Sequence, residues 1–267
     1  MLTEQQIEKA ADNLYAAEQG RKQIAPLTLT YPNMDMDDAY AVQTAWVQRK
    51  IKDGRKVIGY KIGLTSRAMQ RVMKIETPDY GVLLDDMIFE DGSDIVTADF
   101  LDPQIEVELA FVLKKALSGE NVTVEEVMNA TDYVVPAFEL IAARSVRANL
   151  ETGYTRKVFD TISDNAANAG IITGGRRVDP KEVDLRWCGA IVESNGVIEQ
   201  TGLAAAVLGH PAKGICWIAK RFAPHGISLE PGQVLLSGSF TAPIKVKAGD
   251  KVTADYGDLG KISVNFV

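Results

Sequence analysis

The chain has 267 residues, 46% of them hydrophobic, and a formal net charge of −7 at pH 7. This is the composition of a globular protein, and a chain of this length can bury a large core without disulfides. The negative charge argues against nucleic acid and against a membrane surface as partners, because an acidic protein is repelled by both. The two cysteines and two histidines lie outside any metal-ligand or triad spacing, which argues against a zinc site and a Ser-His-Asp triad.

Two helices are predicted first, over residues 3–19 and 36–53, with a Pro-containing connector at 27–33 between them. Asp35 is a suitable N-cap for the second helix and Gly54 a suitable stop. The first helix has no apolar signal-peptide core, and no segment reaches the ~20 apolar residues that span a bilayer. We therefore expect a cytoplasmic protein.

The sequence pattern changes at residue 56, where strand-forming residues replace helix-forming ones. Residues 56–66 are predicted to form a strand that leads into a short helix over 66–73. Residues 77–87 are predicted to form a loop, because Pro78 and Gly81 are turn formers.

Most of the remaining chain is predicted to be β-strand. The strand candidates cover residues 104–114, 132–142, 170–174, 187–193, 197–200, 233–239, 243–247 and 251–266. Asn195-Gly196 predicts a type I′ hairpin turn, and one long helix is expected over 211–223. This order favours an α+β protein with a mixed or antiparallel sheet over a doubly wound parallel sheet. We divide it into a helical region, 1–55, and a catalytic domain, 56–267.

Three carboxylates lie within apolar strand candidates. In "IEVELAF" the period of two places Glu106 and Glu108 on one strand face, and Glu139 lies within "VVPAFEL". Each Glu alone could pair with an arginine, but a pair on one face plus a third buried Glu is better explained by a shared cation. An all-oxygen set selects a hard ion, Mg²⁺ or Mn²⁺, and leaves about three of six octahedral positions open.

These strands also carry a resemblance to a known family. The phrases "GYKIGLTS", "TPDYGVLLDDM", "IEVELAFVL", "ATDYVVPAFEL", "RKVFDTISDNAANAG", "AAAVLGHPA" and "YGDLGKISVNFV" resemble the fumarylacetoacetase-like superfamily. Within it, the likeness is greatest to the hydratases and decarboxylases of aromatic meta-cleavage pathways. The resemblance covers nearly the whole chain in the order of the family.

The resemblance implies a fumarylacetoacetase-like mixed β-sheet roll or sandwich with an N-terminal helical region. It implies that Glu106, Glu108 and Glu139 bind the divalent metal. It also implies a homo-oligomer in homoprotocatechuate degradation that adds water to an unsaturated 2-oxo or 2-hydroxy acid. A seven-carbon diacid is the expected substrate.

Two residues are expected to move protons in such a reaction. Lys61 lies between apolar neighbours, where burial would lower its pKa, and Asp79 lies in the predicted Pro/Gly loop. The resembling hydratases are expected to use this Lys and this Asp, whereas decarboxylase relatives tend to have an apolar residue at the Asp position. Without the resemblance, Lys61 is an end-of-strand lysine reaching water and Asp79 a turn residue.

Four further residues are candidates for substrate binding. Ser239 in "LLSGSFTAP" matches a hydroxyl residue of the family that can donate to the substrate carboxylate, and Ser163 is a weaker candidate. Arg156 and Lys157 are the cations favoured for a distal carboxylate, in a loop that could cover the site. Turn chemistry for the serines and solvated charge for the cations are the alternatives.

Other functions use the same motifs. Hydration of 2-hydroxypenta-2,4-dienoate or decarboxylation of 4-oxalocrotonate would need the same metal, although Asp79 argues against decarboxylation. A hydrolase that cleaves a C–C bond would need a histidine-assisted water, and both histidines lie outside the motifs. A non-catalytic scaffold subunit of a decarboxylase–hydratase complex would need none of these carboxylates.

Overall fold

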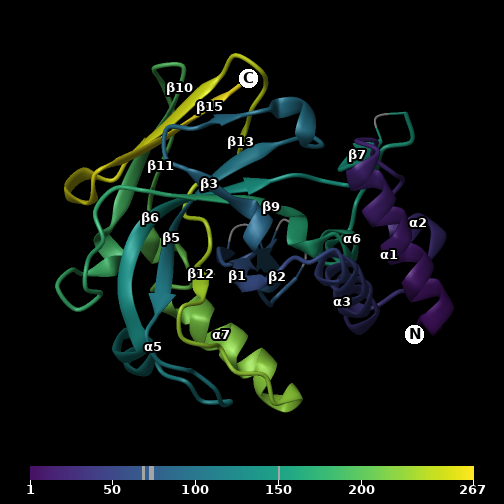
Figure 1. The fold of residues 1–267 in the computed structure, drawn as a ribbon, viewed down its shortest axis with the longest axis horizontal. Helices are drawn as coiled ribbons and strands as arrows, with labels where there is room; N and C mark the ends of the chain where they lie inside the picture. Colours follow the sequence, from purple (N-terminus) through teal and green to yellow (C-terminus); the bar gives the residue numbers. More distant parts are fainter. Residues whose placement is uncertain (68–69, 72–74, 150) are drawn as a thin grey trace.

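The computed structural model describes residues 1–67, 70–71, 75–149 and 151–267. Its two main sheets are joined by a common core and bordered by helices (Figure 1). The described helices are α1 (Glu4–Gln19), α2 (Leu27–Thr30), α3 (Met36–Lys52), α5 (Val124–Ala130), α6 (Val158–Ser163) and α7 (Ala212–Phe222). The described strands are β1 (Val57–Gly63), β2 (Asp79–Leu84), β3 (Ile88–Glu90), β4 (Asp94–Ile95), β5 (Gln104–Leu113), β6 (Thr131–Ile141), β7 (Ala148–Asn149), β8 (Tyr154–Thr155), β9 (Asn168–Thr173), β10 (Gly189–Ser194), β11 (Val197–Leu203), β12 (Val234–Leu236), β13 (Ile244–Lys245), β14 (Lys251–Asp255) and β15 (Lys261–Phe266).

The larger sheet is mixed and positions the functional residues. Its strands follow the order β2-β1-β12-β5-β6-β9-β3, and β13 pairs with the start of β5. The pairs β1–β12 and β9–β3 are parallel, and the others are antiparallel. The central strands alternate as expected, since Ile105, Val107 and Leu109 of β5 enter the main core.

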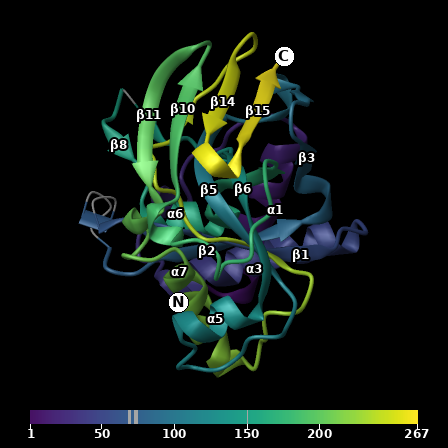
Figure 2. The same ribbon diagram turned by 90° about the vertical axis from the view of Figure 1, so that its left-hand side faces the viewer.

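The smaller sheet has the order β11-β10-β14-β15-β4 and lies above the larger one in the view of Figure 2. Its β10–β11 hairpin turns at Asn195 and Gly196, whose φ angles of 53° and 79° confirm the type I′ turn. Helices α5 and α7 lie at the opposite end of the molecule in this view.

The N-terminal helices pack on one side of the larger sheet, beside α6 (Figure 1). Asp35 caps α3 as predicted, through a hydrogen bond from the backbone N–H of Asp38 to its side chain. The second hydrophobic core combines residues of α1 and α3 with β2 and α6, including Trp46, Val82 and Ile162. These helices therefore need the sheet to bury their apolar faces.

The α+β class and the mixed sheets are as predicted, but one loop prediction is wrong. The connector at 27–33 contains the short helix α2, and most of 77–87 is the strand β2 rather than a loop. Pro78 ends the segment before the strand, and Gly81 lies inside it where the backbone of Asn165 approaches. A Cβ at Gly81 would lie 2.5 Å from the Asn165 carbonyl oxygen, so this glycine indicates close backbone contact and not a turn. The helix predicted over 66–73 lies partly outside the described residues.

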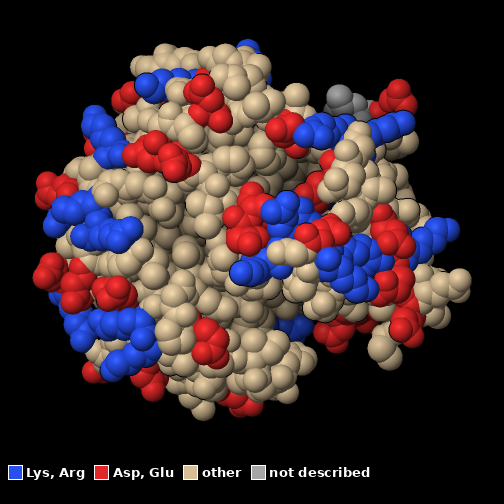
Figure 3. All heavy atoms as spheres, in the orientation of Figure 1, with Lys and Arg blue, Asp and Glu red and all other residues tan. Residues whose placement is uncertain are grey.

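The surface carries charges of both signs. On the face drawn in Figure 3, basic and acidic side chains alternate in small groups, as expected for a protein without an extended basic surface there. None of the described helices is both long enough and apolar enough to cross a membrane.

Candidate active site

The three glutamates identified in the sequence meet on the larger sheet. Glu106 on β5 is directly opposite Glu139 on β6, and Glu108 follows two residues later on the same face of β5. One carboxylate oxygen from each lies within 4.8 Å of the other two. Glu108 and Glu139 are fully buried, whereas Glu106 is partly exposed and marks the open side of the cluster.

Each buried carboxylate has one oxygen held by the protein and one oxygen left over. Glu108 Oε2 accepts a hydrogen bond from the backbone N–H of Gly238 at 2.7 Å, and Glu139 Oε1 accepts from Asn168 Nδ2 at 2.9 Å. The other oxygens, Glu108 Oε1 and Glu139 Oε2, are buried and receive no hydrogen bond from the described residues. Buried polar atoms normally have a partner, so these oxygens fit a hard cation.

Lys61 and Asp79 lie beside this cluster. The side chain of Lys61 is buried, with Nζ 3.2 Å from Glu139 Oε1. Asp79, the first residue of β2, is opposite Gly63 on β1. A Cβ at Gly63 would lie 2.2 Å from Asp79 Oδ1 and 3.3 Å from Lys61 Nζ, so the two groups border the space that this glycine leaves open.

Burial and crowded negative charge shift the pKa values of these groups. Burial, followed by the charge of Glu139, raises the pKa of Glu106 to about 7 and raises that of Glu108 well above its usual range. Burial also raises the pKa of Asp79, an effect opposed by Lys61 and more weakly by Arg156. A raised pKa means that a buried acid holds its proton to higher pH than it would in water.

The lowered pKa predicted for Lys61 is wrong. Burial by itself would lower the pKa of the Lys61 ammonium, but the carboxylates around it, led by Glu139 and Asp79, raise it above its usual value. Lys61 is therefore held as a cation by the charge of the cluster.

A cavity of about 360 Å³ opens on the exposed side of Glu106. Ser239 lines this cavity, together with Thr65 and Thr241. The Oγ of Ser239 lies 3.2 Å from the Val107 carbonyl oxygen and 2.9 Å from that of Thr241, so turn chemistry already accounts for this hydroxyl. Its role toward a substrate stays a prediction.

The segment from β8 to β9 supplies the other predicted binding residues. Arg156 is buried, with Nη1 3.6 Å from Asp164 Oδ2, and that nitrogen makes no hydrogen bond to the described residues. Ser163, the last residue of α6, is fully buried, and its hydroxyl is equally without a described partner. The side chain of Lys157 is exposed. Of the two cations, Arg156 is the better placed to receive a buried anion.

Sequence reasoning missed Asn168, Gly63 and Gly238, which contact the candidate residues. The period of a strand reveals only which residues share a face. Asn168 begins β9 next to β6, and this adjacency follows from the sheet order and not from local sequence. An asparagine opening an apolar strand was the one available signal.

Comparison with known proteins decides the family. The family model described as the fumarylacetoacetate (FAA) hydrolase C-terminal domain matches residues 36–267. The chain belongs to the fumarylacetoacetate hydrolase family. It is 57% identical over 257 residues to the 2-oxo-hept-4-ene-1,7-dioate hydratase of Escherichia coli, covering 96% of each chain. It is 38% identical over 265 residues to the 2-keto-4-pentenoate hydratase of Paraburkholderia xenovorans (strain LB400), covering 99% of this chain and 96% of the relative.

A solved structure of the same family matches the whole fold. The 4-oxalocrotonate decarboxylase from Pseudomonas putida G7, complexed with magnesium and adipate, superposes with a TM-score of 0.94. It is 35% identical, and the match covers 100% of this chain and 99% of that chain. The N-terminal helices of this fumarylacetoacetate hydrolase family member are therefore included in the match.

Proposed function

We propose that the protein is a divalent-metal-dependent hydratase that adds water to 2-oxohept-4-ene-1,7-dioate and releases 4-hydroxy-2-oxoheptanedioate. The observation that carries this proposal is the three-carboxylate cluster with two unpartnered oxygens beside Lys61 and Asp79. The 57% identity to a hydratase of this substrate supports the choice of reaction.

The ion would be held by Glu106, Glu108 and Glu139, and Mg²⁺ or Mn²⁺ suits this all-oxygen set. A magnesium-bound relative with the same fold supports a divalent metal. When bound, the ion would act as a Lewis acid toward the C2 oxygen of a 2-oxo acid.

Protons would move through Asp79, with Lys61 providing fixed charge. Water addition to the conjugated acid needs a group that takes a proton from water and one that returns a proton to carbon. Asp79 is suited to this exchange because burial raises its pKa. Lys61 would stabilise the negative charge that develops on the substrate, because its ammonium group lies beside the cluster.

The remaining candidates would recognise the substrate carboxylates. Ser239 and Ser163 are proposed contacts of the 2-oxo acid end. Arg156 would bind the distal carboxylate, with Lys157 as the second cation of the segment. Arg156 is favoured because its Nη1 is buried without a hydrogen bond among the described residues. A role in homoprotocatechuate degradation, a cytoplasmic location and a homo-oligomeric state stay predictions.

The test is to incubate the metal-loaded protein with 2-oxohept-4-ene-1,7-dioate. The loss of absorbance of its conjugated dienoate form is followed, and the mass of the product is measured by mass spectrometry. A product heavier by one water is expected. Loss of CO₂ would assign a decarboxylase and chain cleavage a hydrolase, so either result would contradict hydration. Faster hydration of 2-hydroxypenta-2,4-dienoate would contradict the seven-carbon substrate.

A further inference from the structure

A buried polar network leads from the first helix to one glutamate of the candidate site. Its centre is Arg144, which follows β6 and is only 4% exposed. Arg144 Nη1 donates to Asp164 Oδ1 at 3.1 Å, and Nη2 donates to the backbone carbonyl of Asn168 at 3.0 Å. The backbone N–H of Arg144 also donates to Asp164 Oδ2 at 2.8 Å. Arg144 therefore holds both ends of the segment from Asp164 to Asn168, where β9 begins.

Asn168 connects this network to Glu139 through a hydrogen bond. Its side chain is fully buried, and its Nδ2 donates to Glu139 Oε1 at 2.9 Å. Lys61 Nζ lies 3.2 Å from the same oxygen. Two donors on Oε1 leave Oε2 as the oxygen of Glu139 that is free for an ion.

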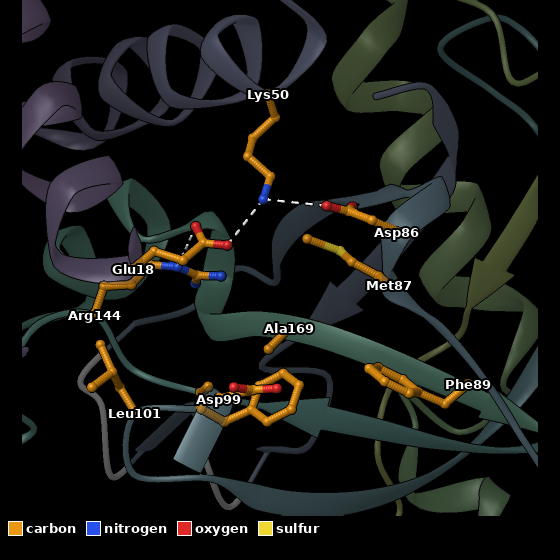
Figure 4. A pocket seen from close by; sticks show the side chains of 11 residues that line it. Glu18, Lys50, Asp86, Met87, Phe89, Asp99, Leu101, Arg144 and Ala169 are labelled. Atoms are coloured by element: carbon orange, nitrogen blue, oxygen red, sulfur yellow. Dashed lines mark hydrogen bonds and ion pairs between the residues drawn. The ribbon is translucent and has the colours of Figure 1, made fainter. Parts of the chain in front are cut away.

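The other end of the network lies on the N-terminal helices. Glu18 of α1 has Oε2 3.4 Å from Arg144 Nε, and its Oε1 lies 3.0 Å from Lys50 Nζ of α3. Figure 4 shows Lys50 between Glu18 and Asp86, with the Arg144 guanidinium against Glu18. The guanidinium also lies over the Trp46 ring, 4.8 Å from its centroid. A cavity of about 120 Å³ lies between these groups and Phe89 and Leu101.

We propose that Asn168 and Arg144 are positioning residues for Glu139, and that Glu18 helps to hold them. The inference rests on the proposed metal site and adds that the N-terminal helices help to set its affinity. Groups that orient a metal ligand through a hydrogen bond typically change metal affinity by 10- to 100-fold when removed. If the network only stabilised the fold, removing one of its groups would lower stability and leave the metal affinity of the folded protein unchanged.

The experiment compares two properties in the full-length protein: the Mn²⁺ dissociation constant, from electron paramagnetic resonance of free Mn²⁺, and the unfolding midpoint in EDTA. Asn168→Ala is expected to weaken Mn²⁺ binding by at least about tenfold. The matched control is Gln43→Ala, because Gln43 is also a buried amide, and its Nε2 donates to the backbone carbonyls of Tyr80 and Ile162, at 2.9 and 3.0 Å, and not to the glutamates. It should lower the unfolding midpoint and leave Mn²⁺ affinity unchanged.

A second pair tests the N-terminal end of the network with smaller changes. Glu18→Gln keeps the shape of the side chain and removes its charge, and it should weaken Mn²⁺ binding. Glu8→Gln, on the same helix and paired with Arg49 at 2.8 Å, should not. This pair decides the question if Asn168→Ala does not fold.

Wild-type affinity in Asn168→Ala, or equal losses in each variant and its control, would overturn the inference. A wild-type protein that binds no Mn²⁺ would overturn both the inference and the proposed metal dependence. A wild-type protein that binds Mn²⁺ but hydrates nothing would overturn only the proposed reaction.

Discussion

At the scale of single residues, two glycines determine the shape of the candidate site. Gly63 leaves the space bordered by Asp79 and Lys61, and a Cβ there would lie 2.2 Å from Asp79 Oδ1. Gly238 adopts φ +118° and donates its backbone N–H to Glu108, while a Cβ there would lie 2.2 Å from Thr65 Oγ1. A side chain at Gly63 would displace the Asp79 carboxyl, and one at Gly238 would displace Thr65, which lines the cavity beside Glu106.

Asp79→Asn should lower kcat by ~10²–10⁴-fold, the usual contribution of a general acid or base. The amide has nearly the same shape as the carboxyl but cannot carry the proton. Mn²⁺ affinity should stay close to wild type, because Asp79 is not one of the three proposed ligands. Steady-state kinetics and Mn²⁺ titration check the prediction, and unchanged kcat would make Asp79 a purely structural residue.

Gly63→Ala should also lower kcat, because the new methyl group would force the Asp79 carboxyl away from its present position. If the two substitutions act on one group, the double variant should lose little more activity than Asp79→Asn alone. Full additivity of the two losses in a double-mutant cycle would show that Gly63 acts elsewhere.

Glu106→Gln should abolish tight Mn²⁺ binding and change how stability depends on pH. The pKa of Glu106 is raised to about 7 in the folded protein, above its unfolded value of 4.5. Between these two pH values, the folded state therefore holds a proton on Glu106 that the unfolded state has lost. This contribution to stability is complete below the unfolded pKa and disappears as pH rises through about 7.

The measurement is the free energy of unfolding in EDTA from about pH 5 to about pH 8. Wild type should lose stability relative to Glu106→Gln as pH rises across this range. Metal binding should strengthen in the same direction, because a ligand must first release its proton. A pH-independent difference between the two proteins would contradict the assigned pKa.

At the scale of elements, the β7–β8 hairpin connects β6 to α6 and positions the cations of this segment. The backbone N–H of Arg156 donates to the Arg147 carbonyl at 2.9 Å, and Arg147 Nε donates to Asp102 at 2.7 Å. Arg156 is buried and Lys157 exposed, although the two are neighbours in sequence. The two cations therefore differ in burial, which the sequence alone does not reveal.

Arg156→Ala should reduce kcat/KM for the seven-carbon diacid by roughly 10- to 100-fold, the value of one charge-assisted hydrogen bond. The loss should be smaller for 2-hydroxypenta-2,4-dienoate, which has no distal carboxylate. Lys157→Ala is the control at the exposed neighbour and should have a smaller effect on the diacid. Equal losses on both substrates would locate the distal carboxylate elsewhere.

At the scale of the whole molecule, the sequence predicted the class of fold and the grouping of the three glutamates. Alternation along 104–114 identified Glu106 and Glu108 because both lie on one strand, whose period is a local property. The strand β2 and the role of Asn168 were missed for a common reason. The close backbone approach at Gly81 involves Asn165, and the side-chain hydrogen bond of Asn168 involves Glu139. Both partners are more than 25 residues away, so local propensity does not reveal these contacts.

The sheet order also constrains when the site can form during synthesis. The strand β12 lies between β1 and β5, so Lys61 and Glu106 are held on strands that become joined only by residues 234–236. A nascent chain that has emerged only as far as α7 still lacks the strand that connects them. The paired strands β5 and β6 are both complete by residue 141, whereas β12 begins only at residue 234. Such non-local pairing is typical of slowly folding proteins.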